Sequence, residues 1–81
     1  MTKHTARLRS PADFGLAVQQ ARLARGMSQS ELAKELDVSQ STISEIESGK
    51  ATIYLRRLLS MARATGLEFS GSWEDDHAPR G

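Results

Sequence analysis

The chain has 81 residues, and its 11 lysines and arginines against 10 aspartates and glutamates give a formal net charge of +1. A chain of this length forms a single domain and buries only about 60–65% of the surface that its unfolded form exposes. The absence of cysteine excludes a disulfide and a thiolate metal site, and the two histidines, His4 and His77, lie far apart in polar sequence. We therefore expect no cofactor and no metal, and we expect a second subunit to supply additional stability.

Charge is distributed unevenly along the chain. Up to Arg25 there are five basic residues and one acid, whereas residues 74–76 are all acidic. This favours one surface facing phosphate and another kept away from it, although a charge run is more often simply solvated. Residues 1–9 are predicted to be a flexible basic arm, in which Arg7 and Arg9 either follow phosphate or only solubilise the arm. No apolar run resembles a signal peptide or a membrane span, so we expect a cytoplasmic protein without a membrane partner.

Residues 10–26 carry the signals of one helix. Ser10 is a good N-cap, and Pro11 follows at the first helical position, where the missing N–H costs nothing. Gly26 supplies a left-handed stop. The pattern predicts a helix from about Pro11 to Arg25. Its buried face is marked by apolar residues at three- and four-residue spacing, namely Phe14, Ala17, Val18 and Ala21.

Two short helices follow, each with its own start signal. Ser28 and Glu31 form a capping box, and Ser39 caps a second helix that runs to about Glu47. Only residues 37–39 separate them, which is the spacing of a helix-turn-helix. An ordinary helical bundle would share the apolar pattern, but not the short turn together with a polar opening of the second helix. We expect the inward-facing residues of this pair to be Leu32, Ala33, Leu36, Val38, Ile43 and Ile46.

The last third of the chain changes its periodicity. A further helix ends at Gly66, with Leu55, Leu58, Leu59 and Ala62 on one face and Met61 beside it. Residues 67–74 then alternate apolar and polar, as a strand does. A lone strand needs a partner, and a second copy in a twofold dimer would supply one; the alternative is a frayed tail. We predict a dimerisation strand at 67–74 with contacts from Leu67, Phe69 and Trp73, and a disordered tail at 75–81.

The opening of the second short helix is polar and carries no lysine or arginine. In a helix-turn-helix this end meets base edges in the major groove. Glutamine can pair with adenine, serine and threonine suit several bases, and Glu45 would favour cytosine. Helix-start amides, Gln29 and Lys50 are placed for phosphate. Capping alone is the alternative for each hydroxyl and is favoured for Ser39. The predicted DNA-contacting set is Gln29, Ser39, Gln40, Ser41, Thr42, Ser44, Glu45 and Lys50.

Residues 29–50, QSELAKELDVSQSTISEIESGK, resemble the helix-turn-helix of the Xre/Cro family, which includes the phage lambda repressor. The resemblance implies a compact helical domain that binds operator DNA as a twofold homodimer. It implies that Gln29 contacts a phosphate and supports the Gln40 side chain, and that Lys50 contacts another phosphate. The base contacts that it implies are at Gln40, Ser41, Ser44 and Glu45. It also implies a structural ion pair between Arg22 and Glu47; the alternative is that the two charges are solvated independently. Asp37 departs from the glycine common in this turn, but aspartate tolerates the left-handed conformation.

Residues 49–69, GKATIYLRRLLSMARATGLEF, resemble the HipB-like antitoxin branch of that family. This resemblance implies terminal strands that pair across the dimer, repression of its own operon and binding of a HipA-type serine/threonine kinase toxin. A stand-alone or phage-derived repressor without a toxin partner and a helical interaction module are the alternatives. No catalytic constellation or phosphate loop is present, so we expect no enzyme activity.

The expected fold is all-α. It is a lambda-repressor-like helix-turn-helix domain of four to five helices over residues 10–66, followed by a short C-terminal strand that pairs across a homodimer. Such a protein would lie in the bacterial cytoplasm and, when bound to DNA, at the nucleoid.

Overall fold

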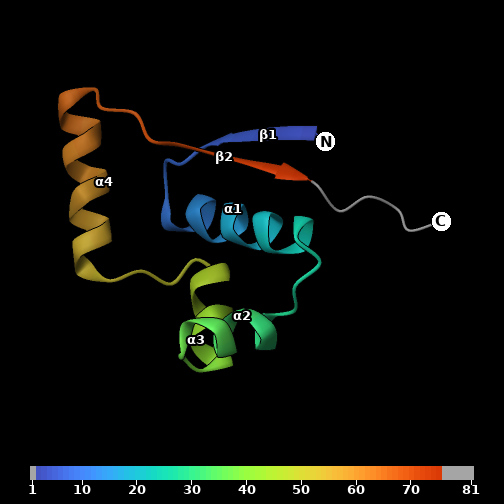
Figure 1. Ribbon diagram of the computed structural model, residues 1–81. Coiled ribbons are helices and arrows are strands. Elements are labelled where there is room, and N and C mark those ends of the chain that lie inside the picture. Colours follow the sequence, from blue (N-terminus) through green and yellow to red (C-terminus); the bar gives the residue numbers. More distant parts are fainter. Residues whose placement is uncertain (1, 76–81) are drawn as a thin grey trace.

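The computed structural model describes residues 2–75 and contains four helices between two short strands (Figure 1). Residues 76–81 of the expected disordered tail lie outside the described residues, and Asp75 is the last residue of a strand. The elements in chain order are β1 (Thr2–Arg7), α1 (Pro11–Ala24), α2 (Gln29–Leu36), α3 (Gln40–Glu47), α4 (Ile53–Thr65) and β2 (Ser70–Asp75). The expected helical domain with a C-terminal strand is confirmed.

Side-chain caps fix the helix starts at the positions that the sequence indicated. The Ser10 hydroxyl accepts from the Asp13 backbone N–H at 3.2 Å, and the Ser39 hydroxyl accepts from that of Thr42 at 3.1 Å. At α2 the capping box is complete, since Ser28 and Glu31 each accept the other's backbone N–H at 3.0 and 2.9 Å. Because these bonds satisfy otherwise orphaned donors, the helices begin where short-range chemistry places them.

The turn between α2 and α3 depends on a left-handed residue. Asp37 has φ 55° and ψ 46°, and it is the one residue other than glycine with positive φ among the described residues. Its backbone N–H closes the helix by bonding to carbonyl oxygens of Ala33 and Lys34. Because of this conformation, only three residues, 37–39, lie between the end of α2 and the start of α3.

Asp37→Gly is expected to stabilise the protein, because an L side chain pays about 1–2 kcal/mol in the left-handed region and glycine does not. Glycine also raises the conformational entropy of the unfolded chain, which offsets part of this stabilisation. We therefore expect the free energy of unfolding, measured by chemical denaturation, to rise by about 0.5 kcal/mol. Asp37→Ala keeps the strain and serves as the control. A loss of stability in Asp37→Gly would contradict this account.

The C-terminal strand pairs within its own chain, not with a second copy as the sequence suggested. β1 and β2 are antiparallel and in register from Thr2 opposite Asp75 to Arg7 opposite Ser70. The N-terminal segment expected to be a flexible arm is therefore a strand. Lys3 faces Glu74 across the pair, and the His4 ring stacks on Trp73 with centroids 5.6 Å apart. Opposite charges and stacked rings favour this pairing, so the basic and acidic ends meet.

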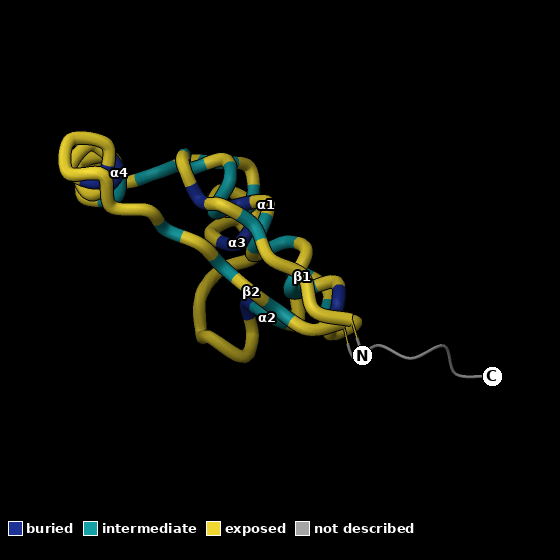
Figure 2. The backbone as a smooth tube through the Cα atoms, turned by 90° about the horizontal axis from the view of Figure 1, so that it is seen from above, coloured by how far each residue is buried: buried dark blue, intermediate teal, exposed yellow. Residues whose placement is uncertain are grey.

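The core is small and lies between α1 and its neighbours. The buried apolar residues are Leu8, Ala24, Ala33, Ile43, Leu59 and Ala62, whereas eleven large apolar residues of the described chain are exposed (Figure 2). Among the residues expected to face the core, Val18 of α1 is exposed at 39%. Three residues of the helix pair are exposed as well: Leu36 at 57%, Val38 at 41% and Ile46 at 44%. Their helices have the expected orientation, but no other element of the described chain covers them.

Helix α4 explains this exposure because it packs elsewhere. Leu59 and Ala62 are buried near Leu8 and Phe69, beside the connection between β1 and α1. Figure 1 shows α4 at one end of the molecule, away from α2 and α3. The molecule is accordingly long, with extents of 49 × 29 × 16 Å. Its radius of gyration is 14.1 Å, against about 12 Å for a compact domain of this length.

Candidate nucleic-acid interface

The opening of α3 presents polar side chains to solvent. Gln40, Ser41, Ser44 and Glu45 are all exposed, and together they line an open depression of about 440 Å³. The hydroxyls of Ser41 and Ser44 make no hydrogen bond to other described residues, so both can bond to an incoming group. α2 and α3 are separate helices, and the predicted base-reading side of α3 faces outward. This is the geometry that insertion into a DNA groove requires.

Two hydroxyls of the predicted DNA-contacting set are already engaged. The Ser39 Oγ and Thr42 Oγ1 atoms lie 2.9 Å apart in a hydrogen bond, and Ser39 also caps the Thr42 backbone N–H. Both side chains remain exposed. Their first role is to hold the start of α3, which agrees with the capping interpretation favoured for Ser39.

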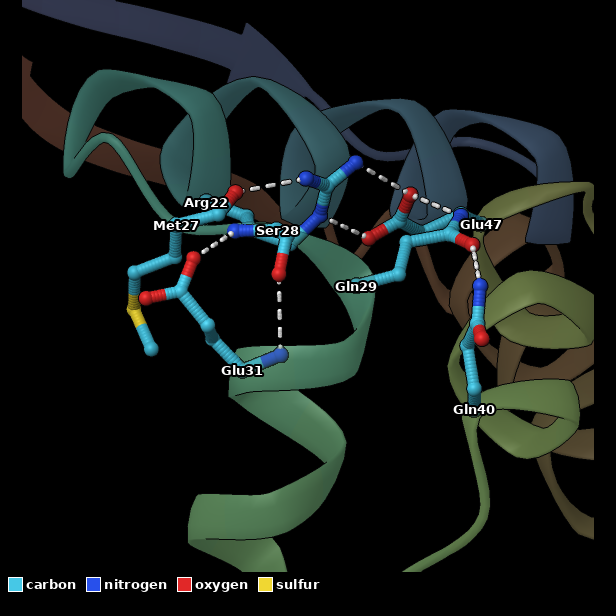
Figure 3. A network of polar contacts seen from close by, with 7 residues as sticks. All are labelled: Arg22, Met27, Ser28, Gln29, Glu31, Gln40 and Glu47. Atoms are coloured by element: carbon cyan, nitrogen blue, oxygen red, sulfur yellow. Dashed lines mark hydrogen bonds and ion pairs between the residues drawn. The ribbon is translucent and has the colours of Figure 1, made fainter.

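Gln40 is held by residues of α2 (Figure 3). Its amide nitrogen donates to Gln29 Oε1 at 3.4 Å, and its amide oxygen accepts from the Ser30 hydroxyl at 3.3 Å. Gln29 in turn donates to Glu47 Oε1 at 3.0 Å. The Gln40 side chain is therefore held by α2 in the absence of any ligand, which lowers the cost of ordering it when a ligand binds.

The network ends in an ion pair buried between α1 and α3. Arg22 donates to both carboxylate oxygens of Glu47, at 2.7 Å from Nε and 3.0 Å from Nη2, and its Nη1 donates to the Met27 carbonyl at 2.7 Å (Figure 3). The two side chains are only 8% and 2% exposed. Two parallel bonds fix both distance and angle. The pair thus joins α1, the start of α2 and the end of α3.

This arrangement shifts the pKa of both partners. Hydrogen bonding from Arg22 lowers the pKa of Glu47, with a further contribution from Gln29, and burial opposes both. The hydrogen bond to Glu47 raises the pKa of Arg22. At the α2 start, the Ser28 backbone N–H lowers the pKa of Glu31, and the Ser28 hydroxyl adds to this. All three groups stay charged at neutral pH.

Lys50 lies just beyond the C-terminus of α3. Its backbone N–H donates to the Glu45 carbonyl at 3.0 Å, and its ammonium is 3.9 Å from the Glu45 carboxylate. Both side chains are well exposed, so this contact is weak. This contact therefore fixes neither the Lys50 ammonium nor the Glu45 carboxylate in place.

The predicted dimerisation residues have different environments. Phe69 packs edge to face on Phe14 of α1, with centroids 6.3 Å apart, and Trp73 stacks on His4. Leu67 is 55% exposed. Two of the three side chains are thus used inside the chain, and Leu67 alone is left open.

Sequence reasoning missed a close backbone contact between α1 and α3. A Cβ placed on Gly15 would lie 2.3 Å from the Ile46 carbonyl oxygen and 2.7 Å from that of Glu47. The backbones of α1 and α3 therefore touch at Gly15, and this contact sets the height of α3 above α1. The available signal was a glycine inside a helical apolar pattern, where it costs stability unless close packing requires it.

The described helices include none long and apolar enough to cross a membrane. Within residues 2–75, no group of three or more His, Cys, Asp or Glu side chains is arranged to hold a metal ion.

Comparison with known proteins gives one family and several relatives. The family model described as helix-turn-helix matches residues 18–71. A chicken endothelial differentiation-related factor 1 homolog is 32% identical over 88% of this chain and 55% of its own length. A multiprotein-bridging factor 1c from Arabidopsis thaliana is 34% identical over 86% of this chain and 47% of its own length. The chain thus spans about half the length of these relatives, and no solved structure matches it.

The family match covers all of α2, α3 and α4 and the second half of α1, so it includes the whole candidate surface. A helix-turn-helix indicates DNA binding and transcriptional regulation. The matched relatives are not HipB-like proteins by name. By the motif, its two separate helices and its matched residues, the chain belongs to the helix-turn-helix family.

Proposed function

We propose that this chain is a sequence-specific transcriptional repressor that binds operator DNA as a twofold dimer. The observation that supports it most is the exposed depression formed by Gln40, Ser41, Ser44 and Glu45 at the opening of α3. Its donors and acceptors are of the types that pair with base edges. Because it holds no cation, these groups supply selectivity, and affinity comes from contacts to phosphate.

The phosphate contacts come from the edges of the motif. Lys50 provides one exposed ammonium. The Gln29 side-chain nitrogen is committed to Glu47, so Gln29 offers its backbone N–H at the start of α2 instead. A helix start attracts an anion through such free amides. Two half-sites about 34 Å apart would match two copies of α3 in a twofold dimer.

Gln40→Ala and Lys50→Ala should weaken DNA binding in different ways. Loss of Gln40 should cost about 1–3 kcal/mol and relax the preference at one base position. Loss of Lys50 should weaken binding to all sequences alike and reduce the salt dependence by about one counterion. Gel shifts on the upstream DNA and on randomised duplexes, at several salt concentrations, measure both effects.

A matched control is available on α2, outside the depression at the opening of α3. Lys34 is a single exposed cation of α2, so Lys34→Ala tests whether any charge loss has the same result. If Gln40→Ala and Lys50→Ala both bind as the unaltered protein does, α3 is not the reading element. Binding that never depends on sequence would leave the helical interaction module as the function.

The antitoxin role is a narrower form of this proposal. It is supported by the resemblance of residues 49–69 to HipB-like proteins, and it adds a HipA-type kinase as partner. A gel shift with and without the product of the adjacent gene tests it, together with co-purification of the two. If no kinase binds, a repressor without a toxin partner remains.

The name of the Arabidopsis thaliana relative, multiprotein-bridging factor 1c, favours a second candidate, a factor that bridges other proteins. Under that function, the chain would need a protein partner for recruitment to a promoter. Footprinting with the purified chain alone separates the two, since a repressor protects its operator unaided.

A further inference from the structure

Helix α4 has two apolar faces, and only one is used. Leu59 and Ala62 are buried at 3% and 6% exposure. Tyr54, Leu58 and Met61, at i, i+4 and i+7, form a second stripe and are 79%, 44% and 64% exposed. Residues at this spacing share one side of a helix. A stripe of three large apolar side chains on a small domain marks an interaction surface.

A second uncovered apolar surface lies on the helix pair. On α2, Leu36 falls between Leu32 and Ala33 around the helix axis, on its inward side, yet it is 57% exposed. Val38 in the turn and Ile46 on α3 are likewise exposed at 41% and 44%. Ile46 lies across the α3 axis from Ser44, so covering this surface would leave the DNA-reading side open.

The chain's own α4 does not cover this surface because its C-terminal end is tied elsewhere. The Leu8 backbone N–H donates to the Phe69 carbonyl at 2.9 Å, and Arg7 pairs with Glu68. These contacts hold the residues after α4 against the start of α1. Figures 1 and 2 both show α4 apart from α2 and α3, joined to them by the linker that follows α3.

Charge favours another copy of this chain as the occupant. α4 contains three arginines and no acid, and Arg57 flanks the apolar stripe, whereas Arg56 and Arg63 lie on the Ser60 side of the helix. The α2 helix and its turn carry Glu31, Glu35 and Asp37 against a single lysine. A basic helix with an apolar stripe thus has its complement, acidic and apolar, on the same protein.

We propose that the α4 stripe of Tyr54, Leu58 and Met61 docks on the Leu36, Val38 and Ile46 surface of a second copy, and the reverse. The exchange is isologous, so two equal contacts close a twofold dimer. This inference deepens the dimer of the proposed function and rests on it. It replaces strand pairing as the source of the dimer.

Leu58→Glu tests the interface, and Ser60→Glu is its control on the outer side of the same helix. Sedimentation equilibrium should show a dimer for the unaltered chain and for Ser60→Glu. Leu58→Glu should raise the dissociation constant of the dimer by about 100-fold, since it weakens two symmetric contacts by about tenfold each. Circular dichroism with unchanged helix content shows that the variant is folded. A dimer unaffected by Leu58→Glu, or a monomeric unaltered chain, overturns the interface.

Cross-linking identifies which surfaces meet, because the chain has no cysteine of its own. Chains carrying Met61→Cys and chains carrying Leu36→Cys are mixed and treated with a short bismaleimide. A linked pair of one chain of each kind is expected, and Ser60→Cys in place of Met61→Cys should give none. Linkage only between two Met61→Cys chains overturns the proposal. A chain carrying both cysteines that links to itself as a monomer shows α4 folding back, and overturns it as well.

DNA binding separates failure of the interface from failure of the proposed function. Leu58→Glu should keep selective binding to one half-site and lose cooperative binding to the full palindrome. If the unaltered dimer forms through α4 but shows no sequence preference, the interface stands and the repressor function fails.

Discussion

Glu47→Gln is expected to destabilise the protein by about 3 kcal/mol, because it leaves the Arg22 guanidinium buried opposite a neutral group. The two side chains are 8% and 2% exposed, so water cannot replace the lost partner. The guanidinium would keep its bond to the Met27 carbonyl but lose two charge-assisted bonds. For a domain of this size the melting temperature should fall by about 15 °C. Thermal and urea unfolding measure the loss.

Glu45→Gln is the matched control on the same helix. The Glu45 side chain is 55% exposed, and its ion pair with the exposed Lys50 is long, at 3.9 Å. Loss of the Glu45 charge should therefore change the free energy of unfolding by less than about 0.5 kcal/mol. Equal effects of the two substitutions would show that the buried pair contributes no more than a surface pair.

The pH dependence of stability gives an independent measure of the pair. The folded-state pKa of Glu47 is lowered, so its contribution is fully present above the unfolded pKa of about 4.3 and is lost as pH falls through the folded value. The stability difference between the unaltered chain and Glu47→Gln should therefore shrink on acidification below about pH 4.3. Glu31 titrates in both proteins and cancels. A constant difference from pH 7 to pH 2 would contradict the assignment.

Gly15→Ala is expected to destabilise the protein by about 3 kcal/mol. In an exposed helix interior the same substitution would stabilise the helix by about 1 kcal/mol. The added Cβ would meet two backbone carbonyl oxygens, at 2.3 and 2.7 Å, and neither can rotate away. α3 would have to lift from α1, which also separates Arg22 from Glu47. The sign of the effect is therefore opposite to that of helix propensity.

Urea unfolding and gel shifts on the same preparation check both consequences for Gly15→Ala. Gln20→Ala, on the exposed side of α1, is the control and should stay within about 0.5 kcal/mol of the unaltered protein. If the urea midpoint of Gly15→Ala is unchanged, α3 can move away from α1 without loss of stability, and the contact at Gly15 does not fix how the two helices pack.

The sequence predicted what short-range chemistry decides. The caps at Ser10, Ser28 and Ser39 act within three residues, so the helix starts and the polar opening of α3 could be placed from the chain alone. The β1–β2 pairing joins Thr2 to Asp75, and nothing local at either end names its partner. The sequence therefore predicts a flexible arm at residues 1–9, where the structure has strand β1.

The core illustrates the same limit. Periodicity shows which side of α2 and α3 faces inward, and Leu36 and Ile46 obey it. It does not say which element covers that side, and within one chain none of the described elements does. The contact at Gly15 was also hidden, because a glycine reveals only that something comes close, not what.

The antiparallel pairing of β1 with β2 places Thr2 opposite Asp75, on the side of α1 away from α2 and α3 (Figure 1). A label attached at residue 2 or at residue 75 would thus lie at the same edge of the molecule, on the side of α1 opposite α3. Donor and acceptor dyes at residues 2 and 75 would transfer energy efficiently while the sheet is intact. The distance between the dyes would report separation of β1 from β2, with no label placed on α3.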